Sequence, residues 1–242
     1  MKLRLDHVVA QRGLVPTRSQ AESWIRLGKV TVNGRVVSKP GFFVAETAEI
    51  AVTSTERYVS RAGLKLASVA GKFQIDFRDK VVLDVGSSTG GFTDYALQNG
   101  ARKVIAVDVG TEQLHPALRG DKRIELHEKT DIRGFVPSEA LDVVVIDVSF
   151  ISLRLILPDV ARMSTAKTEI VAMVKPQFEA ERGQSHSGII RNERMRRDII
   201  KDFEDWAKQL FIIRKKADSE VKGAHGNQER FYVLTRLSRI DR

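Results

Sequence analysis

The chain has 242 residues, which suits one large domain or two modest ones, and 42% of them are hydrophobic, enough for a sizeable core. It contains no cysteine, which excludes disulfides, thiolate zinc sites and a cysteine nucleophile and fits a reducing cytoplasm. Lys and Arg number 40 against 31 Asp and Glu, a net charge of +9 that favours a polyanionic partner. No apolar run reaches the roughly 18 residues of a membrane span, so we expect a cytoplasmic protein with no membrane contact.

The first 55 residues are the more basic part of the chain, with eight Lys and Arg against four Asp and Glu. Their pattern predicts an amphipathic helix from Leu3 to a turn at Gly13, a second helix that stops at Gly28, and a hairpin whose turn is Asn33-Gly34. Basic side chains gathered on so small a module more often hold phosphates than read bases. The candidate RNA-binding residues are Arg4, Arg18, Arg26, Lys29 and Arg35.

Short motifs in this stretch resemble the S-four RNA-binding domain of ribosomal proteins and RNA-modifying enzymes. The matching pieces include Gly13-Leu14, the run from Thr17 to Ala21, Gly28-Lys29-Val30 and Val32-Asn33-Gly34. The resemblance implies a small α+β domain over residues 1–55 that anchors RNA, followed by a linker over 56–62. The alternative is a small helical hairpin whose arginines are merely solvated.

From Lys80 onward, short apolar runs alternate with longer amphipathic stretches. Runs of this length that are rich in Val and Ile indicate buried strands, and helical patterns between them predict crossover units and a mostly parallel sheet. The clearest helix is predicted over 192–210. We therefore expect an α/β domain over 63–242, with strands at 81–85, 104–107, 143–146, 170–174 and 231–234.

Four of these runs contain, or are directly followed by, a charged residue, which is uncommon in a buried strand. These residues are Asp84, Asp108, Asp147 and Lys175. In an open parallel sheet, ligands bind outside the carboxyl ends of the strands. The sequence therefore predicts that the four side chains converge on one crevice.

A glycine-containing turn follows the first of the runs. Glycines between a strand and a helix let the backbone approach a ligand closely. The spacing is not that of a dinucleotide fingerprint or a P-loop, which argues against an NAD enzyme. An ordinary tight turn is the alternative reading. The turn comprises Gly86, Ser87, Ser88, Thr89, Gly90, Gly91 and Phe92.

An acid before the turn and a second acid 22 residues after Gly86 resemble the S-adenosyl-L-methionine site of a Rossmann-like methyltransferase. The resemblance implies S-adenosyl-L-methionine as cofactor and a seven-stranded sheet with helices on both faces. Asp84 would be the acid of the first motif, and Asp108 would bind the ribose. Asp131 would contact the adenine amino group. The alternative is that Asp131 is an ordinary loop residue, since Asp is common in loops. Asp147 would border the same site.

Chemistry limits which groups could accept the methyl group. Methylation of pyrimidine carbon five usually needs a cysteine, and exocyclic amines are usually methylated beside an Asn/Asp-Pro-Pro-aromatic loop, where this chain has Asp147-Val148-Ser149-Phe150. Hydroxyl acceptors remain, and these need a base or positive charge near the oxygen. Lys175 at a strand end, with Asp147 on a neighbouring strand, meets that need.

The order Lys65, Asp147, Lys175, Glu229 resembles the Lys-Asp-Lys-Glu tetrad of the FtsJ-like 2'-O-ribose methyltransferases. With the amino-terminal module and the segment Tyr58-Val59-Ser60-Arg61, the whole chain resembles the TlyA-type rRNA methyltransferases, or haemolysin A homologues. The resemblance implies methylation of a cytidine 2'-hydroxyl in ribosomal RNA. Lys175 would take or orient the hydroxyl proton, Asp147 and Glu229 would position the lysines, and Lys65 would support them.

Two departures from the family pattern bear on the prediction. The family often has Trp where this chain has Tyr58, and the tail stops soon after Leu237. Short members are associated with the large ribosomal subunit, so we expect large-subunit rRNA as substrate. Glu220 is an alternative to Glu229 as the tetrad acid.

The remaining features carry less information. The five histidines lack metal-ligand spacing, so we expect no metal site. The segment Arg182–Gly188 is expected to be a loop over the crevice, and the four arginines of 191–197 are either a phosphate-contacting face or a solvated helix start. A non-catalytic rRNA-binding or assembly protein and a haemolysin-like, membrane-active protein are the alternative functions. The sequence does not determine the oligomeric state; we favour a monomer.

Overall fold

The computed structural model describes residues 2–15, 18–26, 28–52, 58–180, 188–190, 192–223 and 226–238. The chain divides into two compact units, Met1–Glu56 and Arg57–Arg242, each described here by itself. Residues 53–57 of the expected linker, residues 182–187 of the expected loop, and Arg191 lie outside the described residues.

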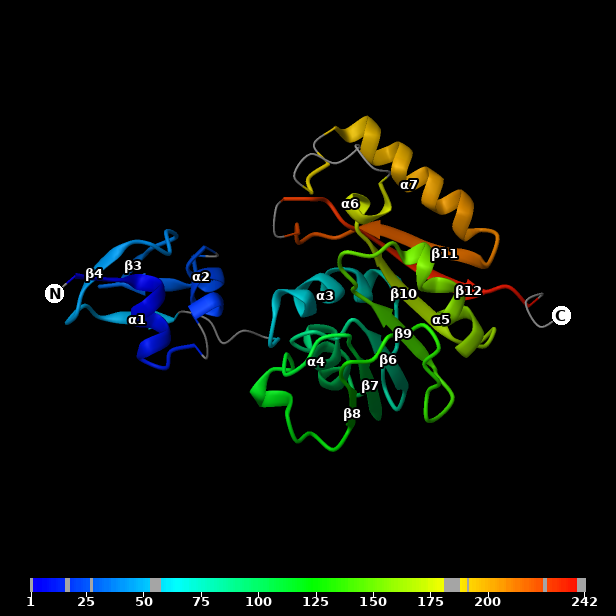
Figure 1. The fold of residues 1–242 in the computed structure, drawn as a ribbon, viewed down its shortest axis with the longest axis horizontal. Helices are drawn as coiled ribbons and strands as arrows, with labels where there is room; N and C mark the ends of the chain where they lie inside the picture. Colours follow the sequence, from blue (N-terminus) through cyan, green and yellow to red (C-terminus); the bar gives the residue numbers. More distant parts are fainter. Residues whose placement is uncertain are drawn as a thin grey trace. The chain divides into compact units, whose positions relative to one another are not determined.

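The amino-terminal unit packs two helices against two small antiparallel sheets (Figure 1). The predicted hairpin turn is present, because Asn33 and Gly34 both have positive φ, as a two-residue type I′ turn requires. The first helix begins two residues later than the sequence predicted, since Lys2–Arg4 pair as a strand with Phe43–Ala45. The elements are β1 (Lys2–Arg4), α1 (Leu5–Gln11), α2 (Arg18–Arg26), β2 (Val30–Val32), β3 (Arg35–Val36), β4 (Phe43–Ala45) and β5 (Ile50–Val52).

The second unit is built on a seven-stranded sheet with strand order β11-β12-β10-β9-β6-β7-β8 (Figure 1). Strands β6 to β10 are parallel, and β12 runs antiparallel to β10 and β11. The strands are β6 (Val81–Val85), β7 (Lys103–Val107), β8 (Ile124–His127), β9 (Val143–Ile146), β10 (Glu169–Val174), β11 (Phe211–Asp218) and β12 (Arg230–Arg236). The helices are α3 (Arg61–Phe73), α4 (Gly91–Gln98), α5 (Leu157–Met163), α6 (Pro176–Glu179) and α7 (Glu193–Ala207), with short 3-10 turns η1 (Pro116–Leu118) and η2 (Leu153–Leu155).

Each face of this sheet is buried under its own helices. Successive strand residues alternate between the faces, so Leu83 packs in the cluster with α5 and α7, whereas Val82 packs in the cluster with α3 and α4. Burial of each such side chain contributes about 1.5–3 kcal/mol. The predicted mostly parallel α/β fold is confirmed.

Two strands, β8 and β11, are absent from the predicted set because they form the two edges of the sheet. An edge strand has a neighbouring strand on one side only and is more open to solvent. Polar residues therefore interrupt its apolar run. In β8 Glu125 and His127 are only half-buried, and in β11 Lys215 and Lys216 are exposed or nearly so. The predicted helix at 192–210 is α7, which Asn192 caps by accepting the backbone N–H groups of Arg194 and Met195.

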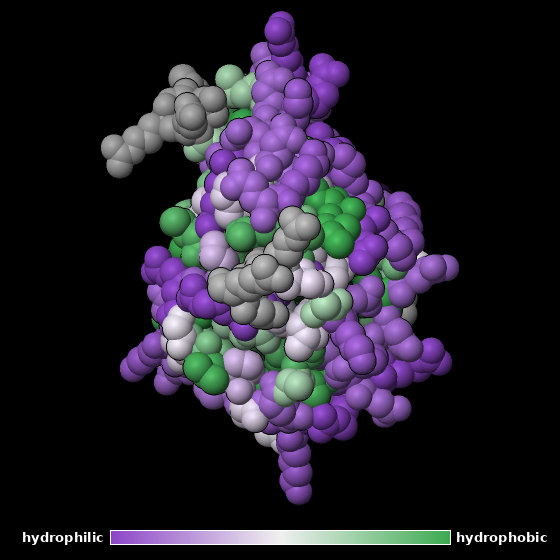
Figure 2. Space-filling view, turned by 90° about the vertical axis from the view of Figure 1, so that its right-hand side faces the viewer, coloured by the Kyte–Doolittle hydropathy of each residue, from purple (hydrophilic) through white to green (hydrophobic). Residues whose placement is uncertain are grey.

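The surface in Figure 2 is predominantly hydrophilic, with hydrophobic residues in small separate areas. Among the described residues, no helix combines the length and the apolar character needed to cross a membrane.

Candidate active site

Lys175 and Asp147 meet where two neighbouring parallel strands end. Asp147 follows the last residue of β9 and Lys175 follows the last residue of β10, and the two strands pair directly. Lys175 Nζ lies 2.7 Å from Asp147 Oδ1, and the side chains are 10% and 16% exposed. Lys175 Nζ also donates a 2.7 Å hydrogen bond to Ser149 Oγ. The Asp147 contact is thus an ion pair, while the directed hydrogen bond goes to Ser149.

Lys65 and Glu229 form a second, deeper ion pair. Lys65 lies in the second turn of α3, and Glu229 immediately precedes β12. Lys65 Nζ lies 2.6 Å from Glu229 Oε2, with side-chain exposures of 12% and 3%. The alternative acid, Glu220, is exposed and pairs with Lys72. Of the two candidate acids, the structure thus pairs Lys65 with Glu229 and not with Glu220.

The two ion pairs lie at the same edge of the sheet. In the β10–β12 ladder the last matched pair at this edge is Val174 with Arg230. Because β12 is antiparallel, Lys175 and Glu229 each come one residue beyond that pair, on facing chains. The register therefore brings the two ion pairs to neighbouring chain ends, in the grouping that the resemblance to the tetrad implied. The crevice expected from the alternation of strands and polar ends was a different set, namely Asp84, Asp108, Asp147 and Lys175.

A cavity of about 480 Å³ adjoins this cluster at the carboxyl ends of β6, β7 and β9. Its volume lies within the range of small-molecule sites. Asp147 and Ser149, which both contact Lys175, also line the cavity, so the two features share a wall. The lining comprises Val85, Gly86, Ser88, Val107, Asp108, Val109, Gln113, Thr130, Asp131, Ile132, Arg133, Asp147, Val148, Ser149, Phe150, Ile151 and Ile156.

The turn after β6 can approach this cavity only because position 86 is glycine. Gly86 has φ +79°, and a Cβ there would lie 2.8 Å from the carbonyl oxygen of Asp147. Of the predicted cofactor residues, five line the cavity: Gly86, Ser88, Asp108, Asp131 and Asp147. The other predicted residues, Asp84, Ser87, Thr89, Gly90, Gly91 and Phe92, lie outside the lining.

Two of the lining acids are held in place by local contacts. Asp108 accepts the backbone N–H of Ser88 at 2.8 Å and that of Gly110 at 2.7 Å, one on each carboxylate oxygen. Asp131 pairs with Arg133 at 2.6 Å, and this hydrogen bond lowers the pKa of Asp131. A carboxylate oxygen can accept more than one hydrogen bond, so both acids keep acceptor sites for a ligand.

Asp84 occupies a different environment beneath the turn. It is fully buried, and its Oδ2 accepts a 2.6 Å hydrogen bond from Thr93 Oγ1. Its Oδ1 has no hydrogen-bond partner among the described residues. Burial, reinforced by the charges of Asp147 and Asp108, raises the pKa of Asp84 to about 7.

Among the cavity residues that were not predicted as site residues, three have contacts or conformations that bear on the site. Ser149 was noted only as part of a loop that argues against amine acceptors, and its contact with Lys175 depends on the β9–β10 pairing. Gln113 accepts a hydrogen bond from Ser88 Oγ at 3.0 Å. Phe150 is 91% exposed with φ +65°, an unusual conformation for a bulky residue, and its ring lies 5.3 Å from that of Phe178. Neither Gln113 nor Phe150 has a distinctive sequence signal.

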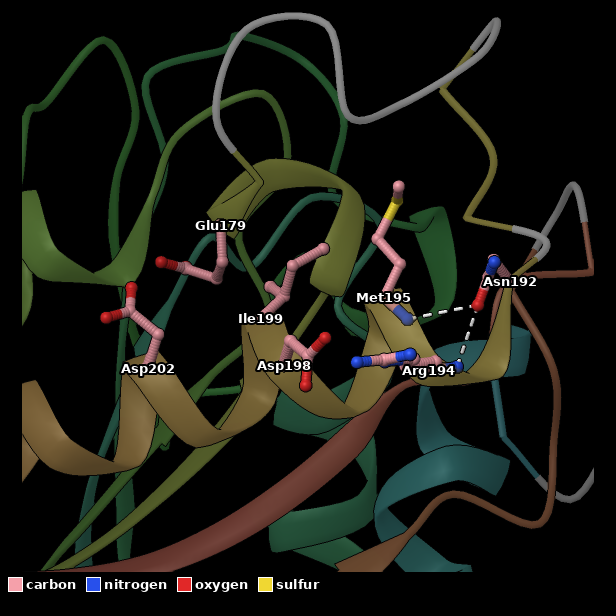
Figure 3. A pocket seen from close by; sticks show the side chains of 7 residues that line it. All are labelled: Glu179, Asn192, Arg194, Met195, Asp198, Ile199 and Asp202. Carbon is pink, nitrogen blue, oxygen red and sulfur yellow. Dashed lines mark hydrogen bonds between the residues drawn. The ribbon is translucent and has the colours of Figure 1, made fainter.

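A second cavity, of about 450 Å³, lies between the end of α6 and the first turns of α7 (Figure 3). Its charged groups are largely engaged in contacts within the fold. Glu179 accepts hydrogen bonds from Ser152 Oγ and the backbone N–H of Leu153, and Asp202 pairs with Arg154. The tetrad residues do not line it, whereas Asp147 lines the cavity at the strand ends, which is therefore the candidate active site.

The predicted RNA-binding residues of the amino-terminal unit differ in their surroundings. Arg4 and Arg18 both pair with Asp6, and Arg35 is exposed at the start of β3. Lys29 is half-buried just before β2. Arg26 belongs to α2, and its side chain is outside the described residues.

No group of three or more His, Asp or Glu side chains arranged to hold a metal ion occurs in the part of the chain that the structure describes.

Both parts of the chain match models of known protein families. Residues 58–236 match the FtsJ-like methyltransferase model, and residues 3–50 match the S4 domain model. The match of the first model covers the two ion pairs and the cavity.

Individual relatives cover nearly the whole chain. The chain is 37% identical to the 16S/23S rRNA (cytidine-2'-O)-methyltransferase TlyA of Mycobacterium tuberculosis, over 96% of this chain and 90% of that protein. It is 39% identical to the 23S rRNA (cytidine-2'-O)-methyltransferase TlyA of Campylobacter jejuni, over 74% of this chain and 71% of that protein.

A solved structure from Streptococcus thermophilus that carries the hemolysin name is 38% identical, with a TM-score of 0.78 over 98% of this chain and 89% of that one. The chain belongs to the family of FtsJ-like methyltransferases that carry an amino-terminal S4 domain, together with the TlyA proteins.

Proposed function

We propose that this protein transfers a methyl group from S-adenosyl-L-methionine to the 2'-hydroxyl of a cytidine in ribosomal RNA. The observation that carries the proposal is the convergence of two buried lysine–carboxylate pairs beside a cavity of cofactor size. The cytidine-2'-O activity that the two TlyA relatives are named for supports the same acceptor.

The cavity fits S-adenosyl-L-methionine by the chemistry of its lining. Asp108 would accept hydrogen bonds from the ribose hydroxyls, and Asp131 would accept one from the adenine amino group. Apolar residues such as Val109 and Ile132 offer surface for the adenine ring. When bound, this cofactor supplies a methyl group activated by a positively charged sulfur.

Lys175 is the residue we assign to the acceptor hydroxyl. In the structure its ammonium is paired with Asp147 and bonded to Ser149, so its position is constrained on two sides. Held in this way, Lys175 would orient the 2'-hydroxyl. In its neutral, deprotonated form its Nζ lone pair would take the hydroxyl proton while the new oxygen–carbon bond replaces the methyl–sulfur bond of the donor. Asp147 and Glu229 are positioning residues for the two lysines, and Lys65 supports the cluster through Glu229.

The amino-terminal S4 domain is assigned to RNA anchoring. Its exposed arginines match the backbone contacts that fix register on a nucleic acid without reading bases. We assign the large subunit as the preferred substrate, in line with the 23S activity for which the Campylobacter relative is named.

The test is methyl transfer from tritium-labelled S-adenosyl-L-methionine to purified ribosomal subunits and to naked rRNA, followed by mapping of the labelled nucleotide. We expect label at a cytidine ribose of 23S rRNA, seen as resistance of the adjacent phosphodiester to alkaline hydrolysis. Label on a base, or cofactor binding with no transfer to any rRNA substrate, would contradict the proposal. RNA binding without cofactor binding would instead favour a non-catalytic assembly protein.

A further inference from the structure

One buried carboxylate in the amino-terminal unit organises two arginines. Asp6, in the first turn of α1, is fully buried. Arg4 donates to it through Nε at 3.0 Å and Nη2 at 2.9 Å, and Arg18 donates through Nε at 3.1 Å and Nη2 at 3.0 Å. The hydrogen bond from Arg4, followed by the contacts of Arg18, lowers the pKa of Asp6 far below its usual range. The carboxylate is therefore charged at all physiological pH values.

The two guanidinium groups nevertheless remain accessible. The side chains of Arg4 and Arg18 are 46% and 53% exposed, whereas Asp6 is 0% exposed. Each arginine contacts Asp6 through Nε and Nη2, and among the described residues neither Nη1 has a hydrogen-bond partner, so these donors can serve a second acceptor. The two cations are held in place by Asp6, so they have already lost much of their side-chain freedom, which lowers the entropic cost of binding an anion.

An exposed aromatic ring lies beside this pair. Arg4 and Phe43 are directly opposite in the β1–β4 ladder, so their side chains lie on the same face of the sheet. Phe43 is 59% exposed, so its ring is accessible to a ligand. A guanidinium next to an exposed aromatic ring is the combination that proteins use for single-stranded nucleic acid.

We infer that Asp6 is the positioning residue of an RNA-contact surface in which Arg4 and Arg18 hold one backbone phosphate while Phe43 stacks on an adjacent unpaired base. The inference rests on the proposed function, since it deepens the RNA anchoring assigned to this unit. It identifies the partner as an RNA loop or single strand, because bases in a duplex are already stacked on their neighbours.

The decisive test compares two substitutions of equal charge in the full-length protein. Asp6→Asn and Glu22→Gln each remove one negative charge, and Glu22 lies at the periphery, 3.9 Å from Arg18 Nε and 39% exposed. If charge alone governed binding, both variants would bind RNA more tightly. If Asp6 organises the arginines, Asp6→Asn weakens binding about tenfold, while Glu22→Gln leaves it unchanged or slightly tighter.

Binding is measured by fluorescence anisotropy with a labelled RNA hairpin that has a single-stranded loop, and with a blunt RNA duplex of the same phosphate number. Thermal unfolding shows whether Asp6→Asn keeps its fold. The substitutions Arg4→Lys and Arg18→Lys test the same surface in a second way, because they keep the positive charge and leave Asp6 in place. Each is expected to weaken binding about threefold to fivefold, because lysine lacks the bidentate fork. Wild-type affinity in both lysine variants, or tighter binding by folded Asp6→Asn, would overturn the inference.

The aromatic part is tested by Phe43→Leu, which should lower affinity for the hairpin about tenfold and leave duplex binding unchanged. An unaltered preference for the hairpin would remove Phe43 from the surface. Calorimetric titration of each variant with S-adenosyl-L-methionine separates the two proposals. Normal cofactor binding with unchanged RNA affinity contradicts only this inference, whereas absence of cofactor binding in the wild-type protein contradicts the proposed function.

Discussion

The two units use buried carboxylates in opposite ways. In the amino-terminal unit one carboxylate, Asp6, holds two arginines whose guanidinium groups stay exposed. At the strand ends of the second unit, Asp147 and Glu229 each hold one lysine, and both lysine side chains are about nine-tenths buried. Exposed, always-charged guanidinium groups suit binding to phosphates, whereas buried amines suit proton chemistry. Asp84 is a third case, because it is fully buried with no cation beside it in the described structure and has a raised pKa.

The substitution Lys175→Ala is the sharpest test of this division between phosphate binding by exposed arginines and proton chemistry by buried lysines. Loss of a group that orients and deprotonates the acceptor is expected to reduce methyl transfer about 10²–10⁴-fold. Binding of S-adenosyl-L-methionine and RNA should stay within about threefold of wild type, because Lys175 itself does not line the cavity and lies outside the amino-terminal unit. Single-turnover methylation and separate binding titrations measure the two effects. Lys167→Ala, which removes an exposed lysine of the same unit, is the matched control.

Near-wild-type turnover in Lys175→Ala would contradict the assigned role. An equal loss of RNA affinity would show instead that this buried lysine acts in binding, as the arginines do, and would remove the distinction between the two regions.

Glu229→Gln tests the pairing of Lys65. A buried ammonium without its partner is expected to lower the free energy of unfolding by about 3–5 kcal/mol. The double variant Lys65→Met/Glu229→Gln should recover part of that stability, because no unpaired charge remains, but not the methyl transfer. Urea unfolding of the three proteins measures the difference. Equal stability of the single and double variants would show that the pair is not electrostatically coupled.

Asp84→Asn tests the isolated carboxylate through the pH dependence of stability. Because the folded-state pKa is raised from 3.8 to about 7, the folded protein binds a proton more tightly than the unfolded chain. Wild-type stability should therefore fall as pH rises from about 4 to 7, a cost of up to about 4 kcal/mol that the amide variant lacks.

Denaturant titrations of wild type and Asp84→Asn from about pH 4 to about pH 8 measure this cost. The variant should gain stability relative to wild type as pH rises. A difference that does not change with pH would mean that Asp84 is ionised throughout and has a compensating partner.

The smallest effect is expected for Arg35→Gln on the surface of the amino-terminal unit. Removing one phosphate contact should weaken rRNA binding about threefold and reduce the slope of log affinity against log salt by about one. Methyl transfer at saturating RNA should be unchanged. Lys167→Gln is the charge-matched control, and equal slopes for the two variants would mean that Arg35 contacts no phosphate.

Much of the fold was accessible from the sequence because burial on both faces of a parallel sheet leaves continuous apolar runs. The strands at 81–85 and 143–146 were predicted with the bounds that the structure has. The edge strands β8 and β11 were not, since one side of each is open to solvent and carries polar residues. Strand β1 was taken as part of a helix, because its pairing with β4 depends on a segment about 40 residues away.

By itself, the sequence determined the five interior strands of the second unit, the helix near 192–210, the polar residues at the strand ends and the hairpin turn, because these follow from local periodicity and backbone preference. Only the tertiary structure decided which lysine meets which carboxylate, that Asp84 is buried beneath the turn while Asp108 faces the cavity, and that Asp6 joins Arg4 to Arg18. The physical reason is that such contacts depend on the register and packing of segments far apart in the chain, which a pattern of neighbouring residues does not encode.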